Sequence, residues 1–320
     1  MARRRRPPRW LGFVLVLALV TTWSLAGEPL RRWWGLPGEG AAPGKSANQL
    51  RVATWNLRNF PDEGQDLERL AARLSALAAD VIAVQEIHDA DRLRQAMPGW
   101  ELALSNAGGR NDQRLGFLYD PSVFELIGAP REHEGLTMGG PVRPGLSGYL
   151  RGRGGGPDFH VLVVHLKASD EGYALRRSQW EVLAGIVEEI AQDDDDVIVL
   201  GDFNATGPTR GRPEEELQAL DARLGAAGLQ RVVNGSGCSA YWDGGRRDVW
   251  HEPSLLDLVW VRGVLAGEVA KVQAESLLHC ARHACRPFRS TPTHPERDYA
   301  DVSDHCPVIV DFLRAPDDDP

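Results

Sequence analysis

The sequence predicts an α/β fold, in which buried strands alternate with amphipathic helices. Apolar runs of three or four residues recur between polar or turn residues, at 81–84, 161–164, 197–200 and 308–310. Such runs are too short for helices and are typical of strands buried on both faces. Two longer segments, 67–77 and 180–190, carry apolar residues at helical spacing. Buried strands covered by such helices indicate α/β layers.

The first 26 residues are expected to be a signal peptide or a signal anchor. Five arginines precede the apolar run 11–20, and Ser24-Leu25-Ala26 provides small residues for a signal peptidase. The run is shorter than the roughly 20 residues of a full membrane span, which favours cleavage. Because the arginines lie before the run, we expect the export machinery to place the rest of the chain outside the cytoplasm.

The remaining 294 residues divide into a linker, one domain and a tail. Proline and glycine interrupt any regular element in 27–48, residues 49–313 form the globular domain, and 314–320 are predicted to be a disordered acidic tail. Loss of residues 1–26 removes five arginines and no acidic residue, so the net charge moves from −9 to −14. This acidity disfavours strong nonspecific nucleic-acid binding, although a bound cation reverses the local charge. We expect a monomer.

Four cysteines, all in the last third of the chain, are expected to form two disulfides in an oxidising compartment. Three pairings are possible among Cys238, Cys280, Cys285 and Cys306. No two of them have the C-x-x-C spacing that is typical of a zinc site.

A polar side chain of a type that binds metals or transfers protons lies at one end of almost every predicted strand. Taken singly, such a residue is usually a turn former or a solvated charge. Rigid strand ends are nevertheless where α/β proteins position functional groups. The complete set favours a single site and consists of Asn56, Glu86, His165, Asp202, Asn204, Asp257, Asp304 and His305.

Phosphodiester hydrolysis is the reaction that needs this combination of residues. It requires a base for the attacking water, groups that stabilise the growing negative charge, and help for the leaving oxygen. Mg²⁺ prefers one or two carboxylates together with water and substrate oxygens, and Mn²⁺ or Ca²⁺ could substitute for it. Glu86 is the predicted metal ligand, with Asn56 and Asp304 beside it.

The histidines and their neighbours supply the remaining groups. His305 paired with Asp257 is the predicted base, whereas His165 and the Asn204 amide are expected to donate hydrogen bonds to the phosphoryl oxygens. Asp202 and Asn204 are two residues apart, so in an extended segment their side chains would face the same side.

These motifs resemble those of the endonuclease/exonuclease/phosphatase superfamily. The resemblance implies a four-layer α-β-β-α sandwich with two packed mixed β-sheets and a site at one end of the sheets. It also implies a metal site at Asn56, Glu86 and Asp304, and catalytic positions at the other five residues. The matching segments, in order, are Thr54-Trp55-Asn56-Leu57-Arg58, Gln85-Glu86, His165-Leu166-Lys167, Gly201-Asp202-Phe203-Asn204-Ala205, Leu256-Asp257-Leu258-Val259-Trp260 and Ser303-Asp304-His305-Cys306-Pro307-Val308.

One position departs from the pattern of pancreatic-type deoxyribonucleases. In those enzymes, which this chain resembles, a glutamate at the position of Gln113 orients the histidine that corresponds to His165. A neutral amide can accept a hydrogen bond from His165 but stabilises an imidazolium less. The resemblance therefore implies that His165 is a phosphate donor rather than a full acid–base group.

The motifs indicate the type of bond that is cleaved more clearly than the substrate that contains it. Export and paired cysteines favour a nuclease acting on DNA or RNA, with a sphingomyelinase-like phospholipid phosphodiesterase, a phosphatase or a non-catalytic binding module as alternatives. Trp242 and Trp250 could stack on bases or pack in the core. Residues that could hold substrate, or could simply be solvated, are Arg110, Gln113, Arg246 and Arg247, together with Arg151 and Arg153 in predicted loops.

Overall fold

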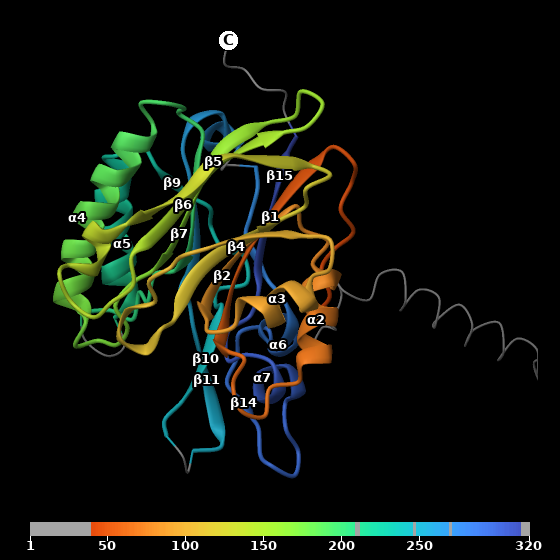
Figure 1. Ribbon diagram of the computed structural model, residues 1–320. Coiled ribbons are helices and arrows are strands. Elements are labelled where there is room, and N and C mark those ends of the chain that lie inside the picture. The colour runs from red at the N-terminus through yellow and green to blue at the C-terminus, as the bar shows by residue number, and fades with distance from the viewer. Residues whose placement is uncertain (1–39, 209–211, 246–247, 269–270, 315–320) are drawn as a thin grey trace, which may run out of the picture.

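The computed structural model describes residues 40–208, 212–245, 248–268 and 271–314 (Figure 1). The predicted signal segment, most of the linker, the tail from residue 315 onward, and Arg246 and Arg247 lie outside the described residues. Within the described part, none of the helices combines the length and the apolar character needed to cross a bilayer.

The first large sheet has six strands in the order β13-β15-β1-β2-β4-β3. It is mixed, because β1 runs parallel to β2 and antiparallel to β15. Its members, in chain order, are β1 (Gln49–Phe60), β2 (Val81–Ile87), β3 (Glu101–Leu104), β4 (Arg114–Tyr119), β13 (Glu275–Ser276) and β15 (Val308–Leu313).

The second large sheet also has six strands, in the order β5-β6-β7-β8-β12-β9. Its central pair, β7 and β8, is parallel and the other pairs are antiparallel. Its members are β5 (Phe124–His133), β6 (Gly145–Gly152), β7 (Asp158–His165), β8 (Val197–Asp202), β9 (Gln230–Arg231) and β12 (Asp257–Val261).

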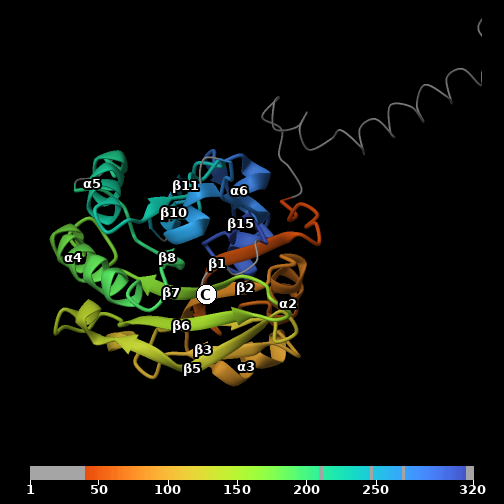
Figure 2. The same cartoon turned by 90° about the horizontal axis from the view of Figure 1, so that it is seen from above.

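Alternation along the strands explains why the molecule has four layers. In β1, Leu50 and Val52 enter the core shared with the second sheet, whereas Ala53 and Trp55 enter the core against the helices. Figure 2 shows helices on the outer sides of the paired sheets. The predicted α/β sandwich is thus confirmed, and its covering helices are α2 (Leu67–Ala76), α3 (Ala90–Ala96), α4 (Tyr173–Ile190) and α5 (Pro213–Gly225).

A small third sheet and two short helices lie at one end of the sandwich (Figure 1). They surround a separate apolar cluster that contains both disulfides, Cys238–Cys285 and Cys280–Cys306. The two predicted disulfides are therefore present, and this pairing resolves the three possibilities. The elements are β10 (Ala240–Asp243), β11 (Trp250–Ser254), β14 (Phe288–Arg289), α6 (Leu278–His283) and α7 (Arg297–Asp301). The chain also contains short 3₁₀ helices, η1 (Gly109–Asn111), η2 (Glu134–Thr137) and η3 (Gly263–Glu268).

Residues 40–48, the described end of the predicted linker, form no helix or strand but contact the domain. The Lys45 ammonium lies 2.7 Å from the Asp80 carboxylate, and the Gly40 carbonyl accepts a hydrogen bond from the Leu278 amide at 2.8 Å. This part of the segment is therefore bound along the first sheet.

Candidate active site

Strand register places three of the polar side chains next to one another. His165 pairs with Asp202 across the parallel strands β7 and β8, and Asp202 pairs with Asp257 across β8 and β12. Directly paired residues face the same side of a sheet. Two residues earlier on β7 and β8, Val163 and Leu200 enter the core between the sheets. The three polar side chains therefore lie on the same side of the sheet as this core, at its edge.

One oxygen atom, Oδ2 of Asp202, lies at the centre of the cluster. It accepts a hydrogen bond from Nδ2 of Asn56 at 3.1 Å, so it links the second sheet to β1 of the first. Nε2 of His165 lies 3.3 Å from it and Nε2 of His305 lies 3.9 Å from it. Asp202 is 2% exposed, so this contact point is shielded from bulk water.

The chain approaches Asp202 through a glycine that no other residue could replace without strain. Gly201 has φ +143°, and a Cβ atom there would lie 2.0 Å from the Val164 carbonyl oxygen. After Asp202 the chain turns, because Asn204 is left-handed (φ +50°) and its amide donates back to Oδ1 of Asp202 at 2.9 Å. The segment from Asp202 to Asn204 is therefore not extended, so the condition under which both side chains would face one side is not met. The Asn204 side chain instead donates to the Leu166 carbonyl at 3.2 Å.

Glu86 reaches the cluster only because β2 is irregular at its end. Simple alternation would direct Glu86 toward the helices, as it does Ile82 and Val84. The pairing of β2 with both neighbours shifts at this point, and Glu86 has φ +64°. Its Oε2 accepts the Asn59 amide at 2.9 Å and its Oε1 lies 3.9 Å from Nε2 of His165. A sequence pattern places a residue at a strand end but does not reveal such a bulge.

His305 and Asp257 are hydrogen-bonded, with Nδ1 of His305 2.8 Å from Oδ2 of Asp257. The Ser239 hydroxyl donates to the same Asp257 oxygen at 2.7 Å. Burial opposes the charged form of His305, but the Asp257 carboxylate, followed by Asp202 and Asp304, raises the pKa of His305 well above its ordinary value. Asp304 lies beside the histidine, and its carbonyl accepts the Tyr241 amide at 2.9 Å.

The other two central groups shift in the direction expected for burial. Burial raises the pKa of Asp202 to about 7, with Asp257 adding to the effect and His305 opposing it. Burial, together with the charges of Arg143 and His305, lowers the pKa of His165 well below its ordinary value. His165 is therefore a neutral imidazole near pH 7, and its Nε2 faces carboxylate oxygens as a donor.

Arg143 is a site residue that the sequence analysis missed. Its Nη2 donates to the Leu166 carbonyl at 3.4 Å, the same oxygen that the Asn204 amide reaches. The charges of Glu86 and Asp202 act on it, and burial lowers its pKa. Arg143 precedes β6, which is antiparallel to the strand that ends at His165. Its place in the site therefore follows from strand pairing, which the sequence alone did not provide.

Gln113 does not orient His165. Its amide donates instead to Oδ1 of Asn59 at 2.8 Å, and the Asn59 backbone holds Glu86. Nδ1 of His165 has no hydrogen-bond partner among the described residues. Exposed Arg110 lies nearby in sequence, and its amide donates to the Pro141 carbonyl at 2.9 Å.

The remaining arginines that could hold substrate lie in different parts of the chain. Arg151 belongs to strand β6 rather than to a loop, and it pairs with Asp158 at the end of β7 opposite His165. Arg153 follows it and donates to the Pro121 carbonyl at 2.7 Å. Both are exposed and lie away from the site, as expected for the alternative that they are solvated surface charges. Arg246 and Arg247 lie outside the described residues.

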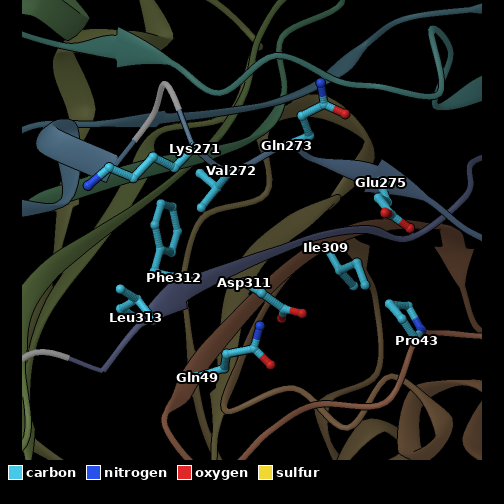
Figure 3. Close-up of a pocket in the computed structure, with 10 residues that line it drawn as sticks. All are labelled: Pro43, Gln49, Lys271, Val272, Gln273, Glu275, Ile309, Asp311, Phe312 and Leu313. Carbon is cyan, nitrogen blue, oxygen red and sulfur yellow. The ribbon is translucent and has the colours of Figure 1, made fainter.

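A cavity of about 360 Å³ lies at the opposite end of the sandwich (Figure 3). Gln49 at the start of β1 and Phe312 near the end of β15 line it, whereas Asn56 lies seven residues further along β1. At about 3.3 Å per residue this separates the cavity from the polar cluster by roughly 23 Å. None of the eight predicted site residues lines this cavity.

Glu86 and Asn56 carry oxygen atoms of the kind that a hard divalent cation prefers. Mg²⁺ takes one or two carboxylates and completes its shell with water and phosphate oxygens. Glu86 and the Asn56 amide oxygen provide such ligands, and Asp304 is a further carboxylate at this end. In the described ranges, His279, Cys280 and Cys306 form the only group of three or more His, Cys, Asp or Glu ligand atoms within 4.8 Å, and their two sulfurs are joined in a disulfide.

Comparison with known proteins identifies the family. Residues 53–305 match the sequence model of the endonuclease/exonuclease/phosphatase family, and the chain belongs to this family. The match spans all eight predicted site residues. Its members act on phosphate esters and generally use divalent metal ions, so the protein is a phosphoester hydrolase. No curated protein sequence matches the chain significantly.

Solved structures share the fold at low sequence identity. TDP2 from D. rerio, complexed with a single-strand DNA product, is 16% identical, with a TM-score of 0.59 over 82% of this chain and 98% of that chain. The human Nocturnin catalytic domain with bound sulfate is 19% identical, with a TM-score of 0.56 over 85% and 97% of the two chains. The mannosyl-6-phosphatase Bt3783 from Bacteroides thetaiotaomicron is 18% identical, with a TM-score of 0.56 over 82% and 100%.

Proposed function

We propose that the protein is a Mg²⁺-dependent phosphodiesterase that cleaves nucleic acid outside the cytoplasm. The observation that carries the proposal is the position of Asp202, whose Oδ2 lies within 4 Å of Asn56, His165 and His305. Beside it, His305 and Asp257 form a hydrogen-bonded pair. An acid–base pair, neutral donors and hard oxygen ligands are together what in-line hydrolysis of a phosphodiester requires.

His305 is the general base in this proposal. It takes a proton from the attacking water at Nε2, while Asp257 holds Nδ1–H and stabilises the imidazolium that forms. His165 and Asn204 donate hydrogen bonds to the phosphoryl oxygens, and the Arg143 guanidinium neutralises the charge that grows there. Asp202 orients Asn56 and faces Nε2 of His165, and its carboxylate lies close to Nε2 of His305.

Glu86, Asn56 and Asp304 are the residues that would hold Mg²⁺. When bound, the cation would polarise the phosphoryl group and stabilise the leaving oxygen. The Asn59 amide keeps the Glu86 carboxylate pointed toward the cluster, and Gln113 supports Asn59 in turn.

Export and the choice of nucleic acid as substrate rest on separate observations. The basic and apolar N-terminus supports export, and two disulfides suit an oxidising compartment. TDP2 from D. rerio, a protein of the same fold, is described in complex with a single-strand DNA product. Other members act differently, as the mannosyl-6-phosphatase shows, so the fold alone does not select the substrate.

A phospholipid-headgroup phosphodiesterase is the second candidate, and one observation favours it. The sequence showed no exposed apolar loop beyond the N-terminus, but Trp242 and Trp250 are 51% and 53% exposed on one hairpin. A membrane-active enzyme of this family would need such a surface for bilayer contact.

The purified chain without residues 1–26 should be assayed with Mg²⁺ and with EDTA on four substrates: plasmid DNA, RNA, sphingomyelin and bis-p-nitrophenyl phosphate. We expect Mg²⁺-dependent cleavage of DNA or RNA and of the small diester. Hydrolysis of sphingomyelin without nuclease activity would replace the proposal with the second candidate. Turnover that EDTA does not reduce would contradict the metal assignment.

A further inference from the structure

A buried arginine and a buried glutamate join the two helices that cover the second sheet. Helices α4 and α5 lie side by side in Figure 1 and Figure 2, and they contribute Arg176 and Glu216. Nε and Nη2 of Arg176 donate to the two Glu216 carboxylate oxygens at 2.7 and 2.8 Å, and both side chains are completely buried. A buried ion pair adds little net stability, because the cost of desolvating two charges offsets their attraction. The contacts that the pair makes with other segments therefore indicate its role.

Arg176 also binds the loop that follows the strand of His165. Its Nη1 donates to the Lys167 carbonyl at 2.9 Å and to the Ser169 carbonyl. Gln179, three residues further along α4 and completely buried, accepts a hydrogen bond from the Lys167 amide at 3.0 Å. Two buried side chains of one helix therefore hold both backbone groups of Lys167, two residues after His165.

The same ion pair binds the loop that follows β8. Nη2 of Arg176 donates to the Thr206 hydroxyl at 3.1 Å, and the Gly207 amide donates to Oε2 of Glu216 at 2.7 Å. The Thr206 amide donates in turn to the Asn204 carbonyl at 2.7 Å. The pair therefore connects the loops that leave the parallel strands β7 and β8 at the active site.

The backbone carbonyl that holds the proposed phosphate donors lies in the first of these loops. The Leu166 carbonyl accepts hydrogen bonds from the Asn204 side-chain amide at 3.2 Å and from the Arg143 guanidinium at 3.4 Å. Leu166 directly precedes Lys167, whose carbonyl Arg176 holds. A shift of one loop against the other would therefore displace both donors, and a displacement of about 1 Å can reduce the rate about a hundredfold.

We infer that Arg176 and Glu216 are positioning residues for the phosphoryl donors of the active site. The inference rests on the proposed phosphodiesterase function, and neither residue is assigned a contact with substrate. Their hydrogen bonds fix the loops after β7 and β8 relative to each other, and these loops place Asn204 and Arg143 where negative charge grows in the transition state. Loss of an interaction that acts in the transition state lowers kcat rather than substrate binding.

A second buried arginine provides a matched control away from the site. Arg51 of β1 is also completely buried, and its Nε and Nη2 donate to the Asp311 carboxylate at 2.6 and 2.8 Å. Its Nη1 donates to the Leu77 carbonyl at 2.9 Å. Asp311 lines the cavity at the opposite end of the sandwich, and Arg51 lies five residues before Asn56, or about 17 Å along the strand. A lysine at either arginine keeps the charge and removes the planar fork.

The test compares Arg176→Lys and Glu216→Gln with Arg51→Lys, using Mg²⁺-dependent hydrolysis of bis-p-nitrophenyl phosphate below the melting temperature of each variant. We expect kcat to fall about ten- to a hundredfold in the first two variants, with KM within about twofold of the unaltered value. Arg51→Lys should lose similar stability in denaturant unfolding but keep its kcat. This difference separates positioning from a general loss of stability.

A double variant tests the same role in a protein of unchanged stability. Arg176→Met/Glu216→Leu replaces both charges with apolar side chains of similar volume, so the melting temperature should hold. The two loops lose their hydrogen-bond partners all the same, so kcat should fall about a hundredfold. Amide hydrogen exchange should become faster in residues 166–169 and 204–207 of this variant, and it should not change there in Arg51→Lys.

The outcomes distinguish the positioning role from the proposed function. Equal kcat values in Arg176→Lys and Arg51→Lys, or a loss confined to KM, would overturn the positioning role alone. Full kcat in the double variant would do the same, even if Arg176→Lys failed to fold. Inactivity of the unaltered protein toward the diester with Mg²⁺ would overturn the proposed function and the positioning role with it.

Discussion

The two halves of the active site are held by different kinds of interaction. His165, Asp202 and Asp257 lie side by side on three adjacent strands, so ladder hydrogen bonds fix their separation. His305 lies outside the strands, on a segment between α7 and β15. Its position depends on single contacts, such as the hydrogen bond of 2.9 Å from Nε1 of Trp55 to its carbonyl.

Both disulfides lie on the less regular half of the site. Cys306 follows His305 directly, and Cys238 precedes Ser239, whose hydroxyl holds Asp257. The two segments are also joined by the Cys306 amide, which donates to the Ser239 carbonyl at 2.7 Å. Sheet register therefore positions the half of the site that contains His165, Asp202 and Asp257. The half that contains His305 is held by covalent cross-links.

The largest expected effect is at His305, where the two halves meet. Because no other described group pairs with Asp257 as a base, His305→Ala should reduce kcat by about 10³- to 10⁴-fold. The variant should stay folded but melt at a somewhat lower temperature, because the buried Asp257 carboxylate keeps only the Ser239 hydroxyl as a side-chain partner. His294→Ala, a change at a histidine outside the site, is the matched control. Retention of more than a tenth of the activity by His305→Ala would refute the base assignment.

Arg143 tests a residue that lies just before a strand rather than in it, although the pairing of β6 with β7 brings it to the site. Arg143→Ala removes a guanidinium that shares the Leu166 carbonyl with the Asn204 amide and should reduce kcat by about 10²- to 10³-fold. Arg143→Lys should recover part of this loss, because the charge remains but the planar fork does not. The control is Arg153→Ala, at the far end of β6. Equal activities of the Arg143→Ala and Arg153→Ala variants would exclude Arg143 from the chemistry.

The strands were predictable from the sequence because burial on both faces leaves a local signal. Uninterrupted apolar runs marked β2, β7, β8 and β15, and helical spacing marked α2 and α4. The polar residues at the strand ends were visible for the same reason. The family motifs then implied two packed sheets, which no local pattern could have established.

Features that depend on pairing or on backbone irregularity could not be predicted. Glu86 enters the site through a bulge and a positive φ, and Asn204 through a turn. Arg143 lies near Asp202 because β6 pairs with β7, and Gln113 contacts Asn59 rather than His165. In each case the sequence gives the residue type but not the partner, which is set by contacts between distant segments.

Removal of each disulfide separately should break the less regular half of the site to different extents. Each pair of Cys→Ala substitutions should cost about 4 kcal/mol of unfolding free energy in the chain-entropy treatment, for sequence separations of 26 and 47. Below the melting temperature, loss of Cys280–Cys306 should reduce kcat by about ten- to a hundredfold, because His305 is displaced. Loss of Cys238–Cys285 should have a smaller effect, since β12 still holds Asp257.

Denaturant unfolding and steady-state kinetics of both disulfide variants measure these two effects. Cys280→Ala/Cys306→Ala should change kcat far more than KM. Equal kcat values in the two variants would show that the cross-links stabilise the fold without positioning His305.

The smallest expected effect is a shift in the pH profile of the Asp304→Asn variant. This variant separates an electrostatic role of Asp304, acting on His305, from a role in binding Mg²⁺. The base must be unprotonated, so activity should rise with pH through the pKa of His305, which Asp257, Asp202 and Asp304 hold above its ordinary value. Asp304→Asn removes one of these negative charges, so the pKa of His305 should fall. The acidic limb of kcat should then move to lower pH by less than about one unit.

The pH profiles should be measured at saturating Mg²⁺, so that a change in Mg²⁺ affinity does not alter the acidic limb. If Asp304 also binds the cation, the Mg²⁺ concentration for half-maximal activity should rise in the same variant, whereas a purely electrostatic role would leave it unchanged. Asp301→Asn, a change at a surface carboxylate paired with Arg297, is the control. A shift of the acidic limb to higher pH would contradict the sign derived for His305, since removal of a nearby negative charge should lower the affinity of the imidazole for its proton.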